Sequence, residues 1–294
     1  MALRHKSYSA RLSTVGFLFA LPGLLGFIGL VVVPFMFSVY FSVTDFGGNF
    51  IFLENYIVTI NSYAFRLAVR NTLRFSGLGI PLLMVVSMFF ALICVKINKH
   101  GIMGIRVLQM ILVLPIMLPT AATALFFSIL FGRFGILNQL GRFAEGGGID
   151  WLRSPTWAFL VLLLLFVWRN FGYTMIVYIA ALGSVAPEIN EAAMCDGAGA
   201  LRRFFSISLP IISPAVFFTV VLNVAAVFRI YRESLMLMGE YPVLSVYMFQ
   251  NYIANNMLHL NFPRVSSASV LFLVFMSFLV AAMVKATQGR GEWM

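Results

Sequence analysis

Polar residues are concentrated in one segment of an otherwise apolar sequence, residues 183–208, which lies between two long hydrophobic runs. The segment contains the acids Glu188, Glu191 and Asp196 and, between them, two adjacent alanines. Small side chains allow the backbone of another protein to approach closely, so these residue types favour a contact site for a partner outside the membrane. An amphipathic interfacial loop without a partner would have the same composition.

A second set of polar residues lies within or at the ends of the hydrophobic runs. Burying polar groups in lipid is costly, so such residues are functional candidates. Planar donors such as guanidinium bind sugar hydroxyls or a carboxylate, which makes these residues candidates for lining a substrate path. The alternative is pairing between or within helices, for instance Arg229 with Glu233 four residues later. The candidates are Arg169, Asn170, Asn223, Arg229, Arg232 and Glu233.

The composition defines the class of protein that must position these residues. Of 294 residues, 61% are hydrophobic and 10% are charged, whereas soluble domains carry roughly 25% charged residues. This indicates a polytopic membrane protein with the lipid bilayer as its solvent. The net charge of +10 does not indicate nucleic-acid binding, because the basic residues sit singly at the ends of hydrophobic runs and form no basic stripe.

Six hydrophobic runs are long enough to cross a membrane as helices. We therefore expect an all-α protein with a single transmembrane domain over residues 1–294. A charge-free stretch from Leu12 to Thr44 is too long for the apolar core of a signal peptide, so the first run is expected to be a retained span. The predicted spans are about 13–41, 73–95, 107–131, 156–182, 206–229 and 265–284.

An even number of spans places both termini on the same side of the membrane. If that side is the cytoplasm, 10 of the 20 Lys and Arg residues lie inside, 8 lie outside and 2 lie in the spans. The positive-inside rule then favours cytoplasmic termini. Cys94 and Cys195 have no CxxC partner, so neither a metal site nor a structural disulfide is expected.

Local signals predict two short helices at an angle within residues 183–208. Pro187 suits the first position of a helix, and Glu188 and Glu191 in the first turns complement the helix dipole. Gly197 weakens helix propensity and permits a sharp turn. Small residues are expected on the outward face of the first helix.

The spacing within this segment is specific. Glu191-Ala192-Ala193 is followed by Gly197 after three residues, Ile207 after nine more, and Leu209-Pro210 after one. This resembles the EAA loop of the inner-membrane permeases of ABC importers. The resemblance assigns the docking role to Glu188, Glu191, Ala192, Ala193, Asp196, Gly197, Ala198, Ile207, Leu209 and Pro210.

The resemblance extends over most of the chain. Glu54-Asn55-Tyr56, Asn71-Thr72 at the head of the second span, and Trp168 are similar to the carbohydrate-uptake branch of this family. The chain looks most like the first-subunit type of maltose permease, in a short form. The expected substrate is therefore a carbohydrate, most simply an oligosaccharide.

Family membership implies partners and a location. The loop would dock into a groove of a cytoplasmic ATPase, present in two copies, and the chain would pair with a second permease of similar fold. An extracytoplasmic solute-binding protein would deliver substrate, and ATP hydrolysis would drive alternating access. The resemblance implies a bacterial-type cytoplasmic membrane with both termini cytoplasmic.

The chain itself is expected to hold no cofactor and to be no enzyme. A nucleotide-binding P-loop ends in Gly-Lys-Ser/Thr, and none of the lysines follows a glycine. ATP and Mg²⁺ are therefore expected on the partner ATPase.

Two questions stay open at the level of sequence. Arg229 and Arg232 stand where a neutral-sugar permease of the maltose type is expected to have apolar residues, so an acidic or larger saccharide is conceivable. The alternative function is a secondary transporter driven by an ion gradient, which usually keeps a membrane-buried acid. Glu233 is the acid nearest a span and is expected at the end of one, which disfavours this alternative.

Overall fold

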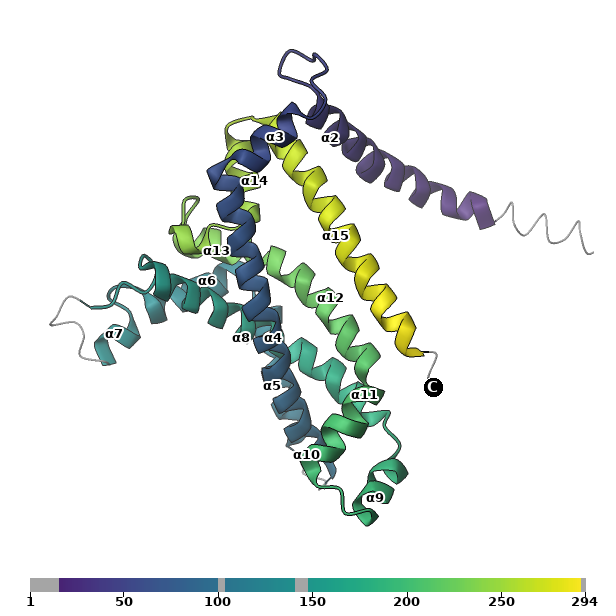
Figure 1. The fold of residues 1–294 in the computed structure, drawn as a ribbon. Coiled ribbons are helices and arrows are strands. Elements are labelled where there is room, and N and C mark those ends of the chain that lie inside the picture. The colour runs from purple at the N-terminus through teal and green to yellow at the C-terminus, as the bar shows by residue number, and fades with distance from the viewer. Residues whose placement is uncertain (1–15, 100–103, 141–147, 292–294) are drawn as a thin grey trace, which may run out of the picture. The chain divides into compact units, whose positions relative to one another are not determined.

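The computed structural model describes residues 16–99, 104–140 and 148–291, and these are almost entirely helical (Figure 1). Within the described part, the extended pairing is one isolated bridge between Thr44 and Phe50. The chain divides into two compact units, Met1–Ser62 with Asn256–Met276, and Tyr63–Asn255 with Ser277–Met294. The sequence predicts a single domain, whereas the contacts divide the chain in two.

Among the described residues, six helices are long and apolar enough to cross a membrane. Three depart from the predicted runs. The helix expected over 73–95 starts ten residues earlier, at Tyr63. The run expected over 107–131 is two helices, and the run expected to start at 206 instead starts at Ser213 and continues to Met238. The beginning of the run expected at 13–41 lies outside the described residues. The six helices are Gly16–Val43, Tyr63–Asn98, Thr120–Leu140, Pro155–Gly183, Ser213–Met238 and Phe262–Ala282.

The first unit is a hydrogen-bonded corner between α2 (Val33–Val43), α3 (Glu54–Asn61) and the start of α15 (Phe262–Gly291). The Asn55 side chain donates to the Thr44 carbonyl at 2.8 Å, and the Tyr56 hydroxyl donates to Ser42 Oγ at 2.8 Å. The hydroxyls of Thr59 and Ser267 are 2.8 Å apart and buried. The Asn55-Tyr56 pair singled out in the sequence therefore fixes the turn that follows α2.

The second unit contains every site residue discussed below. Before the polar segment it has α4 (Tyr63–Lys99), α5 (Ile105–Met117), α6 (Thr120–Phe131), α7 (Ile136–Leu140) and α8 (Pro155–Gly183). After that it has α9 (Pro187–Cys195), α10 (Ala200–Arg203), η2 (Phe204–Ser208), α11 (Leu209–Ile211), α12 (Ser213–Arg229), α13 (Tyr231–Met238), η3 (Leu244–Val246) and α14 (Phe249–Leu258).

Helix α8 is the centre of this unit. Of the span windows, that of α8 is the most buried inside the protein, at 56% against 39% for α4. Phe166 of α8 is fully buried, and its ring meets that of Phe75 on α4 edge-on at 5.4 Å. Ser87 on α4 donates to the Phe171 carbonyl at 3.0 Å, which adds a polar tie between the two helices. Hydrogen bonds of this kind and close van der Waals contact hold membrane helices together.

The Asn71-Thr72 pair also has a structural role. The Asn71 side chain donates to the carbonyls of Leu244 and Tyr247 at 2.6 and 2.9 Å, and Thr72 Oγ1 accepts the Phe249 N–H at 2.9 Å. These bonds satisfy irregular backbone between α13 and α14 and hold it against α4. Buried backbone groups outside regular helices need such partners, because an unpaired buried N–H or C=O is costly.

Gly172 sets the distance between α8 and α5. A methyl group added at Gly172 would fall on the carbonyl of Leu112 and within 2.8 Å of Val113 Cα. Both obstacles are backbone atoms, which cannot move aside without separating the helices. Small residues at helix crossings serve this purpose in membrane proteins generally.

We expect Gly172→Ala to lower the stability of the protein by about 1–3 kcal/mol, the usual cost of overfilling a close contact. The matched control is Gly77→Ala on α4, where nothing lies within 4 Å of the added methyl group. Thermal unfolding in detergent would measure both variants. Equal unfolding temperatures for the two variants would contradict the role given to Gly172.

Candidate functional site

Two helices are interrupted beside the middle of α8. The first interruption separates α5 from α6 at Leu118 and Pro119, both in extended conformation. Pro119 has no N–H and disfavours helical geometry at the residue before it. The second interruption, at Ile230, separates α12 from α13. Non-helical backbone at membrane depth is tolerated only where protein surrounds it or where it lines a cavity.

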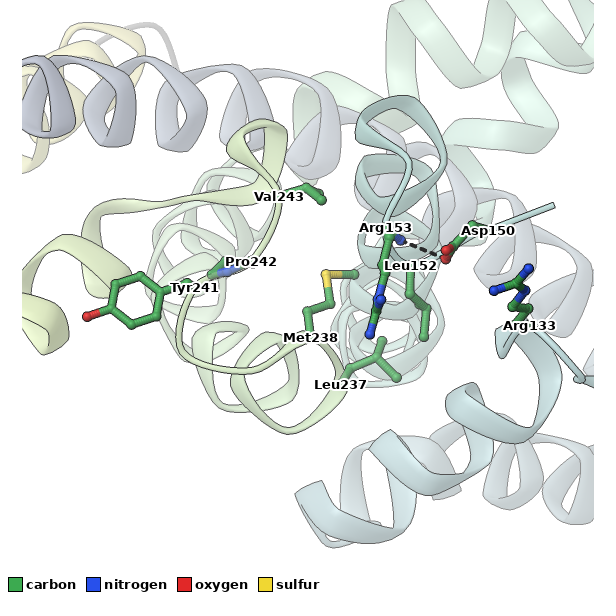
Figure 2. A pocket seen from close by; sticks show the side chains of 9 residues that line it. All are labelled: Arg133, Asp150, Leu152, Arg153, Leu237, Met238, Tyr241, Pro242 and Val243. Carbon is green, nitrogen blue, oxygen red and sulfur yellow. Dashed lines mark hydrogen bonds between the residues drawn. The ribbon is translucent and has the colours of Figure 1, made fainter.

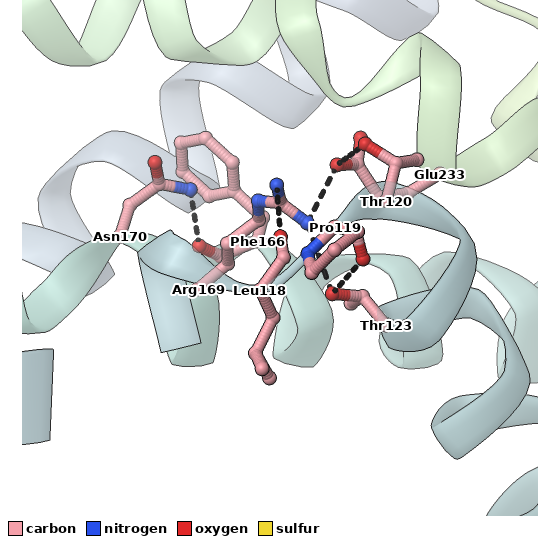
Figure 3. Close-up of polar contacts among 8 residues, drawn as sticks. All are labelled: Leu118, Pro119, Thr120, Thr123, Phe166, Arg169, Asn170 and Glu233. Atoms are coloured by element: carbon pink, nitrogen blue, oxygen red, sulfur yellow. Dashed lines mark hydrogen bonds and ion pairs between the residues drawn. The ribbon is translucent and has the colours of Figure 1, made fainter. Parts of the chain in front are cut away.

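Arg169, half-way along α8, satisfies the first interruption. Its Nη2 donates to the Leu118 carbonyl at 3.1 Å, and its Nη1 donates to Thr123 Oγ1 at 3.0 Å (Figure 3). The same Nη1 lies 2.9 Å from Glu233 Oε1 of α13. One guanidinium therefore joins α8, the break between α5 and α6, and α13.

The pair that forms differs from the pair considered in the sequence. Glu233 is bound to Arg169 and has no ion pair with Arg229 in the part of the chain that the structure describes. Its side chain is 4% exposed, and it lies inside the Ser213–Met238 span rather than at the end of one. Thr120 Oγ1 lies 3.4 Å from the paired oxygen, and Oε2 has no hydrogen-bond partner among the described residues. The i, i+4 rule considers only neighbours on one helix, whereas the partner comes from another helix.

A hollow of about 200 Å³ opens beside this pair. It brings together five of the six candidates for the substrate path, and it adds Thr120, which the sequence analysis did not single out. Arg229 and Arg232 are exposed, and neither has a hydrogen bond or an ion pair with another described residue. The lining residues are Ile116, Thr120, Arg169, Asn170, Ala226, Arg229, Ile230, Arg232 and Glu233.

Asn223 is the candidate that the structure places elsewhere. It is 3% exposed and joins α12 to α8, because its Oδ1 accepts a hydrogen bond from Thr174 at 3.4 Å. The buried hydroxyls of Tyr178 and Thr219 lie 2.8 Å apart and make a second tie between the same helices. For Asn223 the geometry supports helix pairing, which was the alternative interpretation of these polar residues.

A second hollow, of about 680 Å³, lies at the other end of α13 (Figure 2). Asn138 joins two of the segments beside it, donating to the carbonyls of Arg133 and Ile149 and accepting from Trp151 Nε1, each at 2.9 Å. The sequence analysis assigned no role to these residues, because they are brought together from three separate loops. The lining residues are Arg133, Asp150, Leu152, Arg153, Leu237, Met238, Tyr241, Pro242 and Val243.

The polar segment forms the two short helices that the sequence predicts, α9 and α10. Gly197 ends α9 with a φ of +76°, a conformation that costs other residues about 1–2 kcal/mol. The N–H of Ala198 bonds to the Ala193 carbonyl at 2.9 Å, and that of Gly197 bonds to the Met194 carbonyl at 3.0 Å. This is a Schellman cap, and it is the physical reason for a glycine at this position.

Most of the docking residues are on the surface. Glu188, Glu191, Ala192, Asp196 and Gly197 are exposed, as is Pro210 in α11, whereas Ala193 is buried and Ala198, Ile207 and Leu209 are half-buried. Large apolar side chains are exposed beside the acids, in the same segment. They are Ile189 at 44%, Met194 at 59%, Leu201 at 75% and Phe205 at 61%.

The described residues contain no group of three or more His, Cys, Asp and Glu side chains that could hold a metal ion. Cys94 is buried, Cys195 is exposed, and both are free thiols.

Interrupted spans and ionisable residues around a hollow are typical of a functional site within a membrane. Residues 84–290 match the family described as "Binding-protein-dependent transport system inner membrane component". The chain belongs to this family, which confirms the resemblance read from the EAA spacing.

Named relatives agree with this assignment. The sn-glycerol-3-phosphate transport system permease protein UgpA of Salmonella choleraesuis (strain SC-B67) is 34% identical over 187 residues, 62% of this chain. That match spans 61% of the relative's own length. The probable ABC transporter permease protein YesP of Bacillus subtilis (strain 168) is 30% identical over 240 residues, 78% of this chain and 75% of the relative.

Solved structures show the same fold. A bacterial ABC transporter involved in the import of the acidic polysaccharide alginate matches with a TM-score of 0.80 and 20% identity, over 98% of this chain and 99% of the other. The alginate transporter in complex with its alginate pentasaccharide-bound periplasmic protein matches with a TM-score of 0.77, over 93% of each chain.

We expect Glu233→Gln to destabilise the protein by about 3–5 kcal/mol, because removing one partner leaves the charge of Arg169, whose side chain is 17% exposed, without its counter-charge. The matched control is Glu240→Gln, which makes the same change at an exposed acid and should shift stability by no more than about 0.5 kcal/mol. Thermal unfolding in detergent compares them. Removing both charges, in Arg169→Met/Glu233→Gln, should recover part of the lost stability. If Glu233→Gln is no more destabilising than Glu240→Gln, the pairing of Glu233 with Arg169 does not stabilise the protein.

Proposed function

We propose that this chain is a membrane-spanning subunit of an ATP-binding-cassette importer that moves a carbohydrate, of oligosaccharide size, into the cell. Membership of the binding-protein-dependent transport family supports the importer class. The fold shared with an importer of an acidic polysaccharide is compatible with a saccharide substrate. The chain would act as a transport subunit rather than as an enzyme.

The observation that carries the proposal is the surface of the α9–α10 segment. Exposed acids, a glycine-capped helix end and four exposed large apolar side chains lie together in this one short segment. Exposed apolar surface is typical of a protein or membrane interface. We assign it to docking on a cytoplasmic ATPase, which would hold ATP and Mg²⁺, so that this chain carries no cofactor.

The remaining partners follow from the class of transporter. A second permease of similar fold would complete the translocation path, two ATPase subunits would bind on one side, and an extracytoplasmic solute-binding protein would deliver substrate on the other. If the α9–α10 segment faces the cytoplasm, both termini are cytoplasmic too, because the spans are even in number. The location would be a bacterial-type cytoplasmic membrane.

The helices on either side of α9–α10 supply a mechanical link to the hollow. Helix α8 ends just before α9 and carries Arg169 half-way along its length; α12 begins after α11 and ends at Arg229. Both arginines line the hollow. A movement of the docking segment would therefore reach the hollow through rigid helices, as rigid-body alternating access requires.

The burial of Glu233 is the observation that favours a secondary transporter, since such proteins use buried acids to couple ions. Glu233 is, however, paired with Arg169 at 2.9 Å and ties α13 to α8. The family of the chain and the exposed docking segment favour the ATP-driven importer.

Reversing one charge tests the docking assignment. We expect Glu191→Lys to reduce the amount of ATPase that co-purifies with the chain at least about tenfold, because an exposed acid at the centre of the contact becomes a like charge to its partner. The control is Glu240→Lys, an exposed acid in the loop after α13. If both variants retain the ATPase equally, the α9–α10 segment is not the docking site.

A second substitution tests the geometry of the segment. Gly197→Ala places a side chain at φ +76°, whereas Gly199→Ala adds the same methyl group at φ −64°, and neither methyl meets another atom within 4 Å. We expect only Gly197→Ala to weaken ATPase binding, because the added side chain strains the turn by about 1–2 kcal/mol. A free energy of this size corresponds to about a tenfold change in the dissociation constant. Equal losses in both variants would assign the effect to side-chain size at the interface instead of the turn.

A further inference from the structure

The charges that line the hollow do not balance. Arg169, Arg229 and Arg232 contribute three positive charges, and Glu233 contributes one negative charge. The acid is already held by Arg169 at 2.9 Å. Two guanidinium groups therefore remain without a counter-charge among the described residues.

The two free arginines are placed to act together. Arg229 is the last residue of α12 and Arg232 lies in the first turn of α13, on either side of the interruption at Ile230. Residues three apart in a helical run lie on the same side of it, and both side chains line the hollow. Thr120, the first residue of α6, lines it as well, and a helix N-terminus also favours negative charge.

Arginine within a span is costly unless a counter-charge or water accompanies it. A permanent counter-charge would neutralise Arg229 and Arg232. The fold does supply such a charge to Arg169, in the form of Glu233. Among the described residues, the hollow therefore keeps an excess of two positive charges.

The second hollow has the same sign of charge. Arg133 and Arg153 line it together with one acid, Asp150. Asp150 accepts the backbone N–H of Arg153 at 3.2 Å, and neither guanidinium has an ion pair among the described residues.

Helix α13 connects the two hollows. It leads from Arg232 and Glu233 in the first to Leu237 and Met238 in the second, a run of eight residues or about 12 Å. Positive charge along both hollows would concentrate and guide an anion.

We propose that the transported saccharide carries a negative group, a carboxylate or a phosphate, and that Arg229 and Arg232 bind this group during passage. The inference rests on the proposed function and specifies its substrate class. Guanidinium binds either group through two parallel hydrogen bonds. The volume of about 200 Å³ is below the 300–1,000 Å³ typical of a whole drug-sized ligand, so the hollow is suited to one charged unit of a longer saccharide.

The test is ATP-driven uptake by the complete transporter, purified with its partner subunits and binding protein and reconstituted in liposomes. The first pair of probes is a trisaccharide of galacturonic acid and the same trisaccharide with its carboxyl groups reduced to alcohols. The second pair is glucose 6-phosphate and glucose. Each pair differs chiefly in charge, and the two pairs separate a carboxylate from a phosphate substrate.

We expect one charged probe to be taken up at least about tenfold faster than its neutral counterpart. In Arg229→Gln/Arg232→Gln, this charged-to-neutral ratio should fall about tenfold or more, the usual effect of losing charge-assisted hydrogen bonds. Arg229→Lys/Arg232→Lys should restore part of the ratio. The control is Arg106→Gln, which removes one exposed positive charge at the start of α5 and should leave the ratio as it is in the wild type.

Three outcomes would overturn the inference. They are uptake of neutral probes as fast as charged ones, uptake of no charged probe, and a ratio that the double glutamine variant leaves unchanged. If that variant instead loses the second permease and all uptake together, the two arginines form ion pairs between subunits. ATP-driven uptake of a neutral probe alone would leave the importer function standing, whereas a purified complex without any ATPase would remove the proposed function itself.

Discussion

The guanidinium of Arg169 meets three requirements of the structure at one point. It supplies donors to the Leu118 carbonyl and the Thr123 hydroxyl, and it neutralises Glu233 on another helix. A buried carboxylate and a broken helix would each be strongly unfavourable in a membrane if left alone. Because Arg169 lies at the centre of α8, the most buried of the spans, it fixes α6 and α13 against the core of the unit.

This arrangement also defines which positive charges remain available. Arg169 is committed to the structure, whereas Arg229 and Arg232 face the same hollow without a partner among the described residues. The two interrupted helices make room for this hollow, because a break in a helix exposes backbone and re-aims the side chains beside it. The hollow is therefore lined both by the pair that holds the helices together and by the two arginines that we propose bind substrate.

The α9–α10 segment is connected to the same place by covalent structure. It is held between α8 and α12, and both helices reach the hollow. The Schellman cap at Gly197 gives the segment a defined turn, so a force on its surface acts on a rigid element. The ties between Thr174 and Asn223 and between Tyr178 and Thr219 hold α8 to α12 along the way. Asn223, expected as a candidate for the path, contributes to this stiffness.

The sequence by itself determined the class of the protein and the form of the α9–α10 segment. Composition requires a membrane protein, since so few charges cannot cover a soluble fold of this size. Pro187 and Gly197 fix the ends of α9 because helix starts and caps depend on the local backbone.

Only the tertiary structure decided that Glu233 pairs with Arg169 rather than with Arg229. It also divided the run at 107–131 into two helices at Leu118 and Pro119, where Arg169 from α8 supplies a donor to the freed Leu118 carbonyl. The second hollow was equally invisible, since Arg133, Asp150 and Tyr241 meet only after α6, α8 and α13 have assembled. Local rules describe neighbours along one helix, whereas the charge balance of a cavity depends on which helices surround it.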